Sequence, residues 1–439
     1  FYNLDSTDFD RVNRYLSSLV EKALVELECS YCIEIDEDNV SITPMTQGRI
    51  SSYYYINHHT VRMFTDRLKG DASVPDLIDI LSSAQEFAQL PVRHNEDQVN
   101  SELATKLPLE VNPHSFDSAH TKTHLLLQAH FSQLPLPSTD YHTDTKSVLD
   151  QAIRVLQAML DVSADRGWLV TSLQVITLLQ MVVQGRWWHD SSLLTLPHIE
   201  LYHLACLRPQ RGKGARKKGS TDFPAAIECL PELMAACDAR RDFLMEALGD
   251  ELSHNQIDQV QQVLERLPQI EVSLEVRGWW EGDTKESAKT VNIQRDGGRH
   301  AESDWIQVHA DQEYVLNLTM SRLNRTKKSD SKAYSPRFPK PKDEGWIVVV
   351  GDVEAQEVVA LKRVGYVRGR NSTQMALLTP ESTGRVIYTL YLMSDCYLGL
   401  DQQYDICLDS NVLPASVGTQ VNSELTFTMD DLDLDKKRR

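Results

Sequence analysis

Residues 144–167 read DTKSVLDQAIRVLQAMLDVSADRG, and the rest of the chain is best understood around this stretch. Between residues 148 and 162, apolar side chains cover most of a helical wheel, which is typical of a helix enclosed on several sides. The polar positions that remain form one narrow stripe at helical spacing: Ser147, Asp150, Gln151, Arg154, Gln157 and Asp161. We therefore predict a central helix with one polar stripe, against which either solvent or a strand of nucleic acid lies.

Helical periodicity also marks the sequence on both sides of this helix. Apolar positions at spacings of three and four predict helices at residues 46–56, 74–87, 98–107, 120–134 and 168–183. The last is the most apolar, but Thr171, Gln174 and Gln180 interrupt it, so it falls short of the roughly 18 uninterrupted apolar residues of a membrane span. We predict an all-helical bundle over residues 46–195 and no membrane contact.

Residues 1–45 carry a different pattern. Apolar positions between Phe9 and Leu27 recur at helical spacing, and two short alternating segments, CIEI and VSI, then flank an acidic turn. A helix followed by such a hairpin indicates the last helix and the wing of a winged-helix domain. The amino end shows no signal peptide and starts inside a sequence with the pattern of a folded domain, so we expect a fragment of a longer protein.

The pattern changes twice more towards the carboxyl end. Residues 196–268 hold shorter helices around a glycine-rich basic loop at residues 208–218, which predicts a small helix-loop-helix unit. Residues 269–412 show twofold periodicity, typical of an antiparallel β-sandwich of the immunoglobulin or fibronectin type. Strands are expected at residues 270–276, 291–294, 305–309, 313–320, 345–350, 358–363, 374–378, 385–393 and 403–409. With a disordered charged tail at residues 413–439, the expected fold class is multidomain α plus β.

Composition restricts the classes of function. The 439 residues include 45 Lys and Arg against 63 Asp and Glu, and the formal charge of -18 repels a phosphate backbone at long range. Tight binding of nucleic acid by the chain alone is therefore disfavoured. Seven scattered cysteines indicate reduced thiols of a nuclear or cytoplasmic protein rather than a disulfide framework.

Two pairs of residues have a spacing that occurs in metal sites. Cys29 and Cys32 form one CxxC pair, and His120 and His124 are one helical turn apart. A structural zinc ion needs four ligands, and neither pair has further ligands at a suitable spacing. Burial beside a strand is therefore favoured over metal binding for the two cysteines, and metal binding is disfavoured for the two histidines.

Three further motifs have both a structural and a functional interpretation. Tyr53, Tyr54 and Tyr55 could stack on bases, but three consecutive residues cannot share one helix face, so core packing is favoured. Lys213 lacks the following Ser or Thr of a phosphate-binding loop, which leaves a solvated loop or phosphate contact by charge alone. The DEGW segment at residues 343–346 lacks the His of a helicase DExH box and leads into a predicted strand.

Five separated motifs resemble those of one protein family. They are QGRISSYYYI (47–56), LPVRHNED (90–97), LLLQAH (125–130), DEGW (343–346) and YTLYLMSDCYLGLDQQY (388–404). With the order of the predicted domains, they are similar to the Sec-sixty-three homology unit, which follows the motor and winged-helix domains of large Ski-two-like helicases. Within this family, the branch that works in the activating signal cointegrator complex is more similar than the spliceosomal branch.

The resemblance implies a role for the central helix. In related helicases one long "ratchet" helix lays polar side chains against a single strand of nucleic acid, and residues 148–161 stand where that helix would be. Gln151, Arg154 and Gln157 are then the candidate contacts, Arg154 to a phosphate or base and the glutamines to sugar or phosphate. The neighbouring Asp150 and Asp161 imply a weak grip.

The resemblance also implies partners and a motor outside this chain. The expected partners are the helicase motor domains of the same chain, other subunits of the activating signal cointegrator complex and, weakly, single-stranded nucleic acid. The sequence contains no phosphate-binding loop, DExH box or arginine-finger context, so we expect no ATP hydrolysis here, with ATP and Mg bound by the absent motor. By resemblance, the parent is a 3′ to 5′ helicase of alkylation repair, transcriptional coactivation and rescue of collided ribosomes.

Two other hypotheses stay open from the sequence. One is a protein-interaction scaffold without nucleic-acid contact, which the net charge of -18 favours. The other is a free-standing hydrolase, which needs a nucleophile with a base and an orienting group. The sequence alone identifies no such set of residues.

Overall fold

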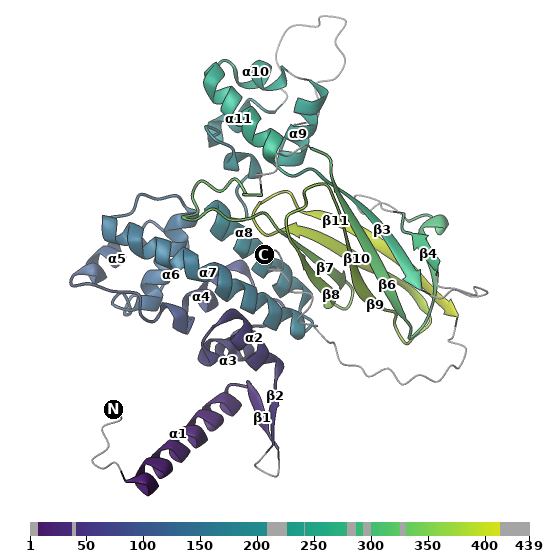
Figure 1. Ribbon diagram of the computed structural model, residues 1–439. Helices are drawn as coiled ribbons and strands as arrows, with labels where there is room; N and C mark the ends of the chain where they lie inside the picture. The colour runs from purple at the N-terminus through teal and green to yellow at the C-terminus, as the bar shows by residue number, and fades with distance from the viewer. Residues whose placement is uncertain are drawn as a thin grey trace, which may run out of the picture. The chain divides into compact units, whose positions relative to one another are not determined.

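The computed structural model describes residues 8–36, 41–208, 226–240, 242–278, 287–292, 300–324 and 331–412 (Figure 1). The chain forms two compact units, residues 1–178 and residues 179–439. The predicted domain limits, after residues 45, 195, 268 and 412, stay predictions.

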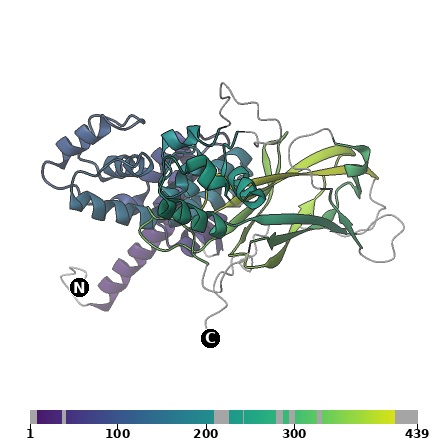
Figure 2. The ribbon, with the colours of Figure 1, turned by 90° about the horizontal axis from the view of Figure 1, so that it is seen from above.

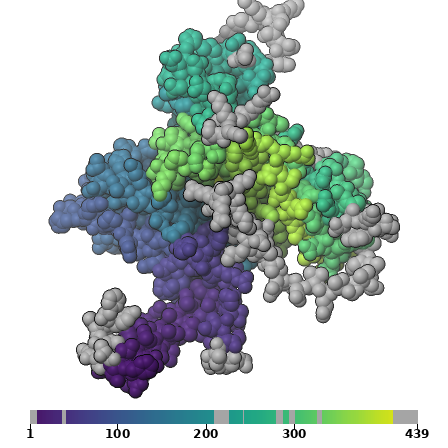
Figure 3. All heavy atoms as spheres, in the orientation of Figure 1, coloured from purple at the N-terminus to yellow at the C-terminus, as the bar shows by residue number. Residues whose placement is uncertain are grey.

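The first unit begins with a long helix and a short hairpin. Helix α1 (Phe9–Cys29) is followed by strands β1 (Ile33–Ile35) and β2 (Ile42–Pro44), which pair antiparallel. The predicted helix and hairpin are therefore present, while their assignment to a winged-helix domain stays a prediction. No residue of α1 is buried, and Figure 3 shows the helix as a projecting segment.

A helical bundle follows the hairpin. Its elements are α2 (Thr46–Tyr54), α3 (His58–Arg67), α4 (Val74–Ser82), the short turn η1 (Gln85–Phe87), α5 (Glu96–Ala104), α6 (Ala119–Phe131), α7 (Thr139–Asp165) and α8 (Leu169–Gln184). All but α3 correspond to predicted helices. The sequence pattern misses α3 because its few apolar residues show no clear period, although Val61 and Phe64 are fully buried.

Helix α7 contains the stretch that the sequence singles out, and it packs against α2, α3, α4 and α6 (Figures 1 and 2). It is 27 residues long and starts where the side chain of Ser138 accepts a hydrogen bond from the N–H of Tyr141. It ends before Gly167, whose φ of +74° is the left-handed conformation that closes many helices. The apolar positions between residues 148 and 162 are buried, apart from half-buried Ile153, so the predicted central helix is confirmed.

A buried ionic network joins α6 and α7 to the start of α5. The ammonium of Lys122, whose side chain has 0% exposure, lies 2.5 Å from Glu96 Oε2 and 2.7 Å from Asp144 Oδ2. The guanidinium of Arg93 lies 2.9 and 2.7 Å from the same two carboxylates. Two cations thus meet two anions, so each buried charge of this network has a counter-charge. Arg93 and Glu96 belong to the LPVRHNED motif, which therefore has a structural role in the bundle.

Short helices open the second unit after the end of α8. They are the turns η2 (Ser192–Thr195) and η3 (Leu201–Ala205), followed by α9 (Leu230–Ala239), α10 (Phe243–Leu248) and α11 (His254–Arg266). They agree with the short helices predicted for this region. Residues 209–218 of the basic loop, including Lys213, and the tail at residues 413–439 lie outside the described residues.

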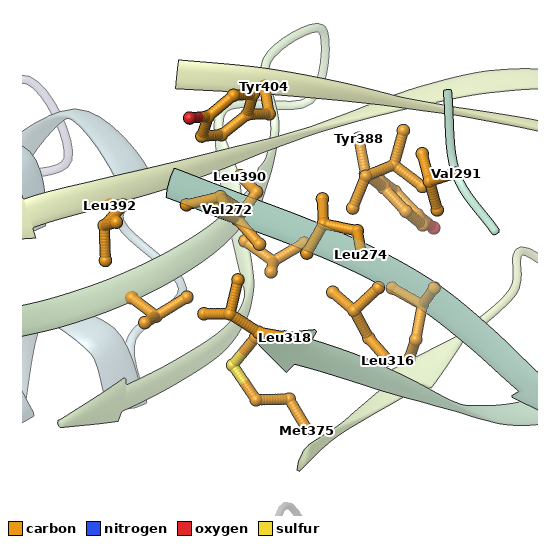
Figure 4. Close-up of a cluster of buried hydrophobic side chains, with 14 of the residues drawn as sticks. Val272, Leu274, Val291, Leu316, Leu318, Met375, Tyr388, Leu390, Leu392 and Tyr404 are labelled. Carbon is orange, nitrogen blue, oxygen red and sulfur yellow. The ribbon is translucent and has the colours of Figure 1, made fainter. Parts of the chain in front are cut away.

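The strands of the second unit form two sheets, which Figure 2 shows as two layers. The strands are β3 (Ile270–Gly278), β4 (Ser287–Thr290), β5 (Ile306–His309), β6 (Glu313–Arg322), β7 (Trp346–Asp352), β8 (Glu357–Val364), β9 (Arg370–Leu378), β10 (Gly384–Ser394) and β11 (Gln402–Val412). One sheet has the order β5-β11-β10-β7-β8 and the other β4-β3-β6-β9. Figure 4 shows Leu274 and Leu318 of one sheet in the same core as Leu390 and Tyr404 of the other. The predicted sandwich is confirmed.

Two details of the sandwich differ from the prediction. Strand β5 pairs parallel with β11, so the larger sheet is not wholly antiparallel. Strand β4 comes before the predicted segment at residues 291–294. Its sequence, SAKT, has no apolar alternation because the strand keeps most of its side chains in water; among the described strands it pairs with β3 alone, at the edge of the sheet.

Buried amides connect the end of α8 to the sandwich within the second unit. Gln180 Nε2 donates to the carbonyl of Ser394 at 2.7 Å, and Gln184 Nε2 donates to the carbonyl of Cys396 at 2.6 Å. Both glutamines are almost fully buried. A polar side chain is tolerated in this apolar helix because each amide satisfies a backbone carbonyl that is otherwise removed from water.

Candidate nucleic-acid interface

The polar stripe of α7 is present as the sequence predicts. Its members keep contact with water while the apolar positions between them are mostly buried. The exposed or half-buried polar residues are Ser147, Asp150, Gln151, Arg154, Gln157 and Asp161. Gln151, Arg154 and Gln157, spaced by three residues, therefore share one face of the helix.

Arg154 is held by hydrogen bonds on this face. Its Nη1 donates to the backbone carbonyl of Tyr55 at 2.8 Å, and its Nη2 donates to Gln151 Oε1 at 2.5 Å. Helix α7 is thereby joined to the end of α2. The guanidinium is oriented before any ligand arrives, and Gln151 helps to orient it.

A second contact between α2 and the stripe lies two helical turns further along α7. The hydroxyl of Tyr54 donates to Asp161 Oδ2 at 2.7 Å. Part of the stripe therefore contacts α2. The two alternatives predicted for the stripe, solvent and nucleic acid, do not include contact with another helix of the bundle. The sequence contains no signal for it, because the two partners are separated by more than 100 residues.

The three consecutive tyrosines have different surroundings. The exposed fractions are 37% for Tyr53, 7% for Tyr54 and 85% for Tyr55. The prediction of core packing is right for Tyr54 and wrong for Tyr55. Tyr55 follows α2 as its C-cap residue with φ of 51°, a left-handed backbone that ends the helix and leaves its side chain in water. An exposed aromatic ring thus belongs to the residue whose carbonyl Arg154 binds.

The charges around Arg154 are mixed. Asp150 is exposed, and Asp161 is half-buried under the Tyr54 hydroxyl. Burial raises the pKa of Asp165 at the end of the same helix, although the neighbouring Arg166 opposes the shift. Carboxylates within a few helical turns of one guanidinium reduce its attraction for a phosphate, so this face suits weak rather than tight binding of a strand.

The pairs with metal-site spacing have other contacts. The predicted burial is wrong for Cys29, which is exposed because α1 buries no residue, and right for Cys32, where burial raises the pKa of the thiol. His120 Nδ1 lies 2.9 Å from the carbonyl of Ser82, and His124 Nδ1 lies 3.0 Å from Gln128 Nε2. Within the described ranges, His, Cys, Asp and Glu side chains form no group of three or more that would hold a metal ion.

The DEGW segment has a structural role at the start of β7. Glu344 is buried and lies 2.7 Å from the guanidinium of Arg322 at the end of β6. Arg322 Nη2 also donates to the carbonyl of Arg266 at 2.8 Å, which ties the end of α11 to the sandwich. Trp346 is buried with 1% exposure.

One cysteine near this segment has the neighbours that a nucleophile needs. Asp395 accepts hydrogen bonds from Lys342 Nζ at 2.6 Å and from the thiol of Cys396 at 2.9 Å. Cys396 is fully buried, and burial together with the Asp395 charge raises the pKa of its thiol well above the ordinary value. A thiol that stays protonated and out of reach of a substrate is not a nucleophile.

In the described part of the chain, no helix is both long and apolar enough to cross a membrane.

The chain combines a helical bundle, whose central helix carries a polar stripe, with short helices and a β-sandwich, in this order along the sequence. Residues 44–407 match the model of the Sec63 Brl domain, and the chain belongs to this family. The family is the one that the five sequence motifs resemble.

Similar full-length proteins are much longer than this chain. Activating signal cointegrator 1 complex subunit 3 of Gallus gallus is 54% identical over 442 residues, covering 99% of this chain and 20% of the relative. The subunit of the same name in Homo sapiens is 52% identical over 443 residues, with the same coverage. The U5 small nuclear ribonucleoprotein 200 kDa helicase of Homo sapiens is 34% identical over 409 residues, covering 93% of this chain and 17% of the relative. The chain thus spans about a fifth of the length of these relatives.

Proposed function

We propose that this chain is a non-catalytic module of a large ATP-dependent nucleic-acid helicase, in which α7 guides a single strand and other surfaces scaffold partner proteins. Membership of the Sec63 Brl domain family supports the helicase setting, because a relative at 34% identity is named as a helicase. ATP and Mg are bound elsewhere, in motor domains of the same polypeptide. The module itself then contributes binding and geometry, not hydrolysis.

One observation carries the guiding role: the guanidinium of Arg154 is bound to the carbonyl of the residue that bears the exposed Tyr55 ring. A guanidinium and an aromatic ring are the two groups that bind single strands without regard to sequence, one through phosphates and the other by stacking on bases. The hydrogen bonds from Arg154 to Tyr55 and Gln151 use two of the five donors of a guanidinium, which leaves donors for a phosphate. Gln157 adds an amide on the same face.

The decisive experiment is charge reversal at Arg154 in the helicase polypeptide that contains this module. We expect Arg154→Glu to slow unwinding of a duplex with a 3′ single-stranded tail by about ten-fold, because it replaces a phosphate contact with a repulsive charge. Assembly with partner subunits should be unchanged. Unwinding at the wild-type rate by a correctly assembled variant would remove the guiding role.

Two further variants separate strand contact from structural damage. Arg240→Glu reverses an exposed charge of the second unit that pairs with Glu246, and it should leave unwinding unchanged. Tyr55→Asn removes the ring but keeps a residue that tolerates a left-handed backbone. We expect Tyr55→Asn to slow unwinding while the melting temperature stays within about 2 °C, since exposed substitutions change stability little.

The finer parts of the proposal rest on the family resemblance of the sequence motifs and on the names of the relatives. Two of them are named as subunit 3 of activating signal cointegrator 1 complex, so the proposed partners are the other subunits of such a complex. We place the parent in the nucleus and cytoplasm, with 3′ to 5′ unwinding and roles in alkylation repair, transcriptional coactivation and rescue of collided ribosomes. A strain that lacks the parent should then be sensitive to an alkylating agent.

A second candidate function is a protein scaffold that no strand contacts. The net charge of -18 and the use of Asp161 and Arg154 to hold α2 favour it. Under this alternative, a correctly assembled Arg154→Glu variant would unwind at the wild-type rate. The unwinding assay therefore distinguishes the two functions.

A further inference from the structure

A pocket lies in the second unit, where helix α9 meets the start of β3, the end of β6 and the start of β11. Its volume is about 590 Å³, within the range of roughly 300–1,000 Å³ that ligand sites occupy. Pro231, Met234 and Asp238 line it from one face of α9, at positions i, i+3 and i+7. None of these residues has a role in the proposed contact with a strand.

The apolar side of the pocket is incompletely covered. Met234 and Leu400 are buried, with exposed fractions of 6% and 4%. Leu323, which lines the same pocket just after β6, is 61% exposed. An apolar side chain that enters the pocket would remove the exposed surface of Leu323 from water, and burial of apolar surface is favourable.

The polar side of the pocket is acidic. Asp238 accepts a hydrogen bond from Gln269 Nε2 at 3.1 Å, and Asp401 accepts one from Gln180 Nε2 at 2.9 Å. Both donors are neutral amides, which satisfy an acceptor without cancelling its charge. Asp401 also accepts a hydrogen bond from the backbone N–H of Ser394 at 2.8 Å, and both Asp238 and Asp401 are exposed residues.

A third carboxylate that lines the pocket, Asp405, belongs to β11 and is half-buried. It accepts a hydrogen bond from Thr389 Oγ1 at 3.1 Å and lies 3.4 Å from His300 Nε2. The described residues that line the pocket include three carboxylates and no Lys, Arg or His. The pocket thus attracts a cation and repels a phosphate, which excludes nucleic acid as its ligand.

We propose that this pocket binds a short segment of a partner protein in which a large apolar side chain stands next to an arginine or lysine. The apolar side chain packs against Met234 and Leu323, and the cation pairs with Asp238 and Asp401. Charge complementarity and the exposed Leu323 favour this occupant over an acidic or a purely polar segment. The proposal names a surface for the scaffolding part of the proposed function and is independent of strand guidance by α7.

The test uses the whole chain with ¹³C-methyl methionine and three tripeptide probes. Met234→Leu identifies the Met234 signal by its loss from the spectrum. We expect acetyl-Leu-Arg-Leu-amide to shift this signal in a saturable manner, while the signals of the fully buried Met159 and Met320 stay in place. Acetyl-Leu-Glu-Leu-amide should bind about ten-fold more weakly, because it places a carboxylate beside Asp238 and Asp401.

Variants decide whether the shift comes from this pocket. Asp238→Asn should weaken binding of the Leu-Arg-Leu probe by about three-fold, as expected for loss of one exposed ion pair. Asp258→Asn, an equal charge change on the exposed face of α11, should leave binding unchanged. The proposal is overturned if Met234 does not shift, if the Glu probe binds equally well, or if acetyl-Ser-Arg-Ser-amide binds equally well, which would indicate charge attraction alone. A failure here would leave the unwinding test of Arg154 unaffected.

Discussion

The guanidinium of Arg154 lies 2.8 Å from the carbonyl oxygen of Tyr55, and this bond joins the middle of helix α7 to the end of helix α2. A cation placed at a helix C-terminus also interacts favourably with the partial negative charge of the last carbonyl groups. The residue with the best claim to contact a strand therefore has a structural role as well. Variants at Arg154 should therefore change both strand contact and stability.

Removal of this guanidinium should cost a modest amount of stability. Arg154→Met keeps the aliphatic stem but loses both hydrogen bonds, and we expect the free energy of unfolding to fall by about 1 kcal/mol for a half-buried group. Urea unfolding followed by circular dichroism measures the change. The stability of Arg154→Lys should lie between that of the wild type and that of Arg154→Met, since one ammonium cannot copy the planar fork of donors in a guanidinium. Equal stability of the Met variant and the wild type would contradict a structural role.

Loss of Lys122 should be far more damaging. Lys122→Met leaves Glu96 and Asp144 with Arg93 as their remaining cation, and breaking a buried pair in this way costs about 3–5 kcal/mol. Lys106→Met, an exposed lysine of the same unit, is the matched control and should change stability by less than about 0.5 kcal/mol. If the two variants unfold at the same urea concentration, the network contributes nothing.

The same network should make the first unit sensitive to acid. Burial acts to raise the pKa of Glu96 and Asp144, but hydrogen bonds from Lys122 and Arg93 outweigh it and lower both pKa values below the ordinary 4.5 and 3.8. Their contribution to stability is therefore present above the unfolded-state values and is lost as pH falls through the lower folded-state values. Hydrogen-exchange pulse labelling at fixed pH, after equilibration between pH 3 and 7 in urea, should show α6 and α7 opening below about pH 4. The double variant Glu96→Gln, Asp144→Asn should show a flatter profile.

Glu344 should make the stability of the second unit depend on pH in the opposite direction. Burial raises its pKa from the ordinary 4.5 to about 7, although Arg322 opposes the shift. A carboxyl group whose pKa is raised by folding contributes stability that is full below its pKa in the unfolded state. This contribution is lost as pH rises towards its pKa in the folded state. The wild type should therefore lose stability relative to Glu344→Gln between pH 5 and pH 8. A constant difference between the two proteins over this range would show that Glu344 does not titrate there.

Gly48 should not tolerate a side chain. A Cβ at this position of α2 would lie 2.2 Å from the carbonyl oxygen of Cys32, where the chain enters the hairpin. Since both groups are backbone, neither can move without shifting an element, and Gly48→Ala should cost about 1–3 kcal/mol. Gly369→Ala is the matched control, because its Cβ would meet nothing within 4 Å. Thermal unfolding of both variants tests the difference.

Periodicity in the sequence predicts those parts of the fold that bury one continuous face. The apolar wheel at residues 148–162 identifies α7, and the twofold pattern identifies the strands that fill the sandwich core. Elements with little to bury leave no such pattern. Helix α3, which buries two large apolar residues, and the edge strand β4 are the elements that the pattern misses or misplaces.

The candidate site is predictable only as a helix face. The spacing of Gln151, Arg154 and Gln157 places them together, and the structure agrees. The partners of Arg154 and Asp161 are a backbone carbonyl and a phenol about 100 residues away, which no local pattern encodes. The exposure of Tyr55 depends on a left-handed backbone at a helix end, whereas consecutive tyrosines in a helical pattern favour packing.

The unequal exposure of the cysteines has a practical consequence for chemical labelling. All seven cysteines lie in described residues: Cys29 is exposed, three are half-buried (Cys206, Cys229 and Cys237) and three are buried (Cys32, Cys396 and Cys407). Burial raises the pKa of Cys32, Cys396 and Cys407, and the thiolate is the form that reacts with maleimides. A fluorophore or spin label added at neutral pH should therefore attach first at the end of α1. The natural sequence thus offers a reporter position beside the hairpin without any engineered residue.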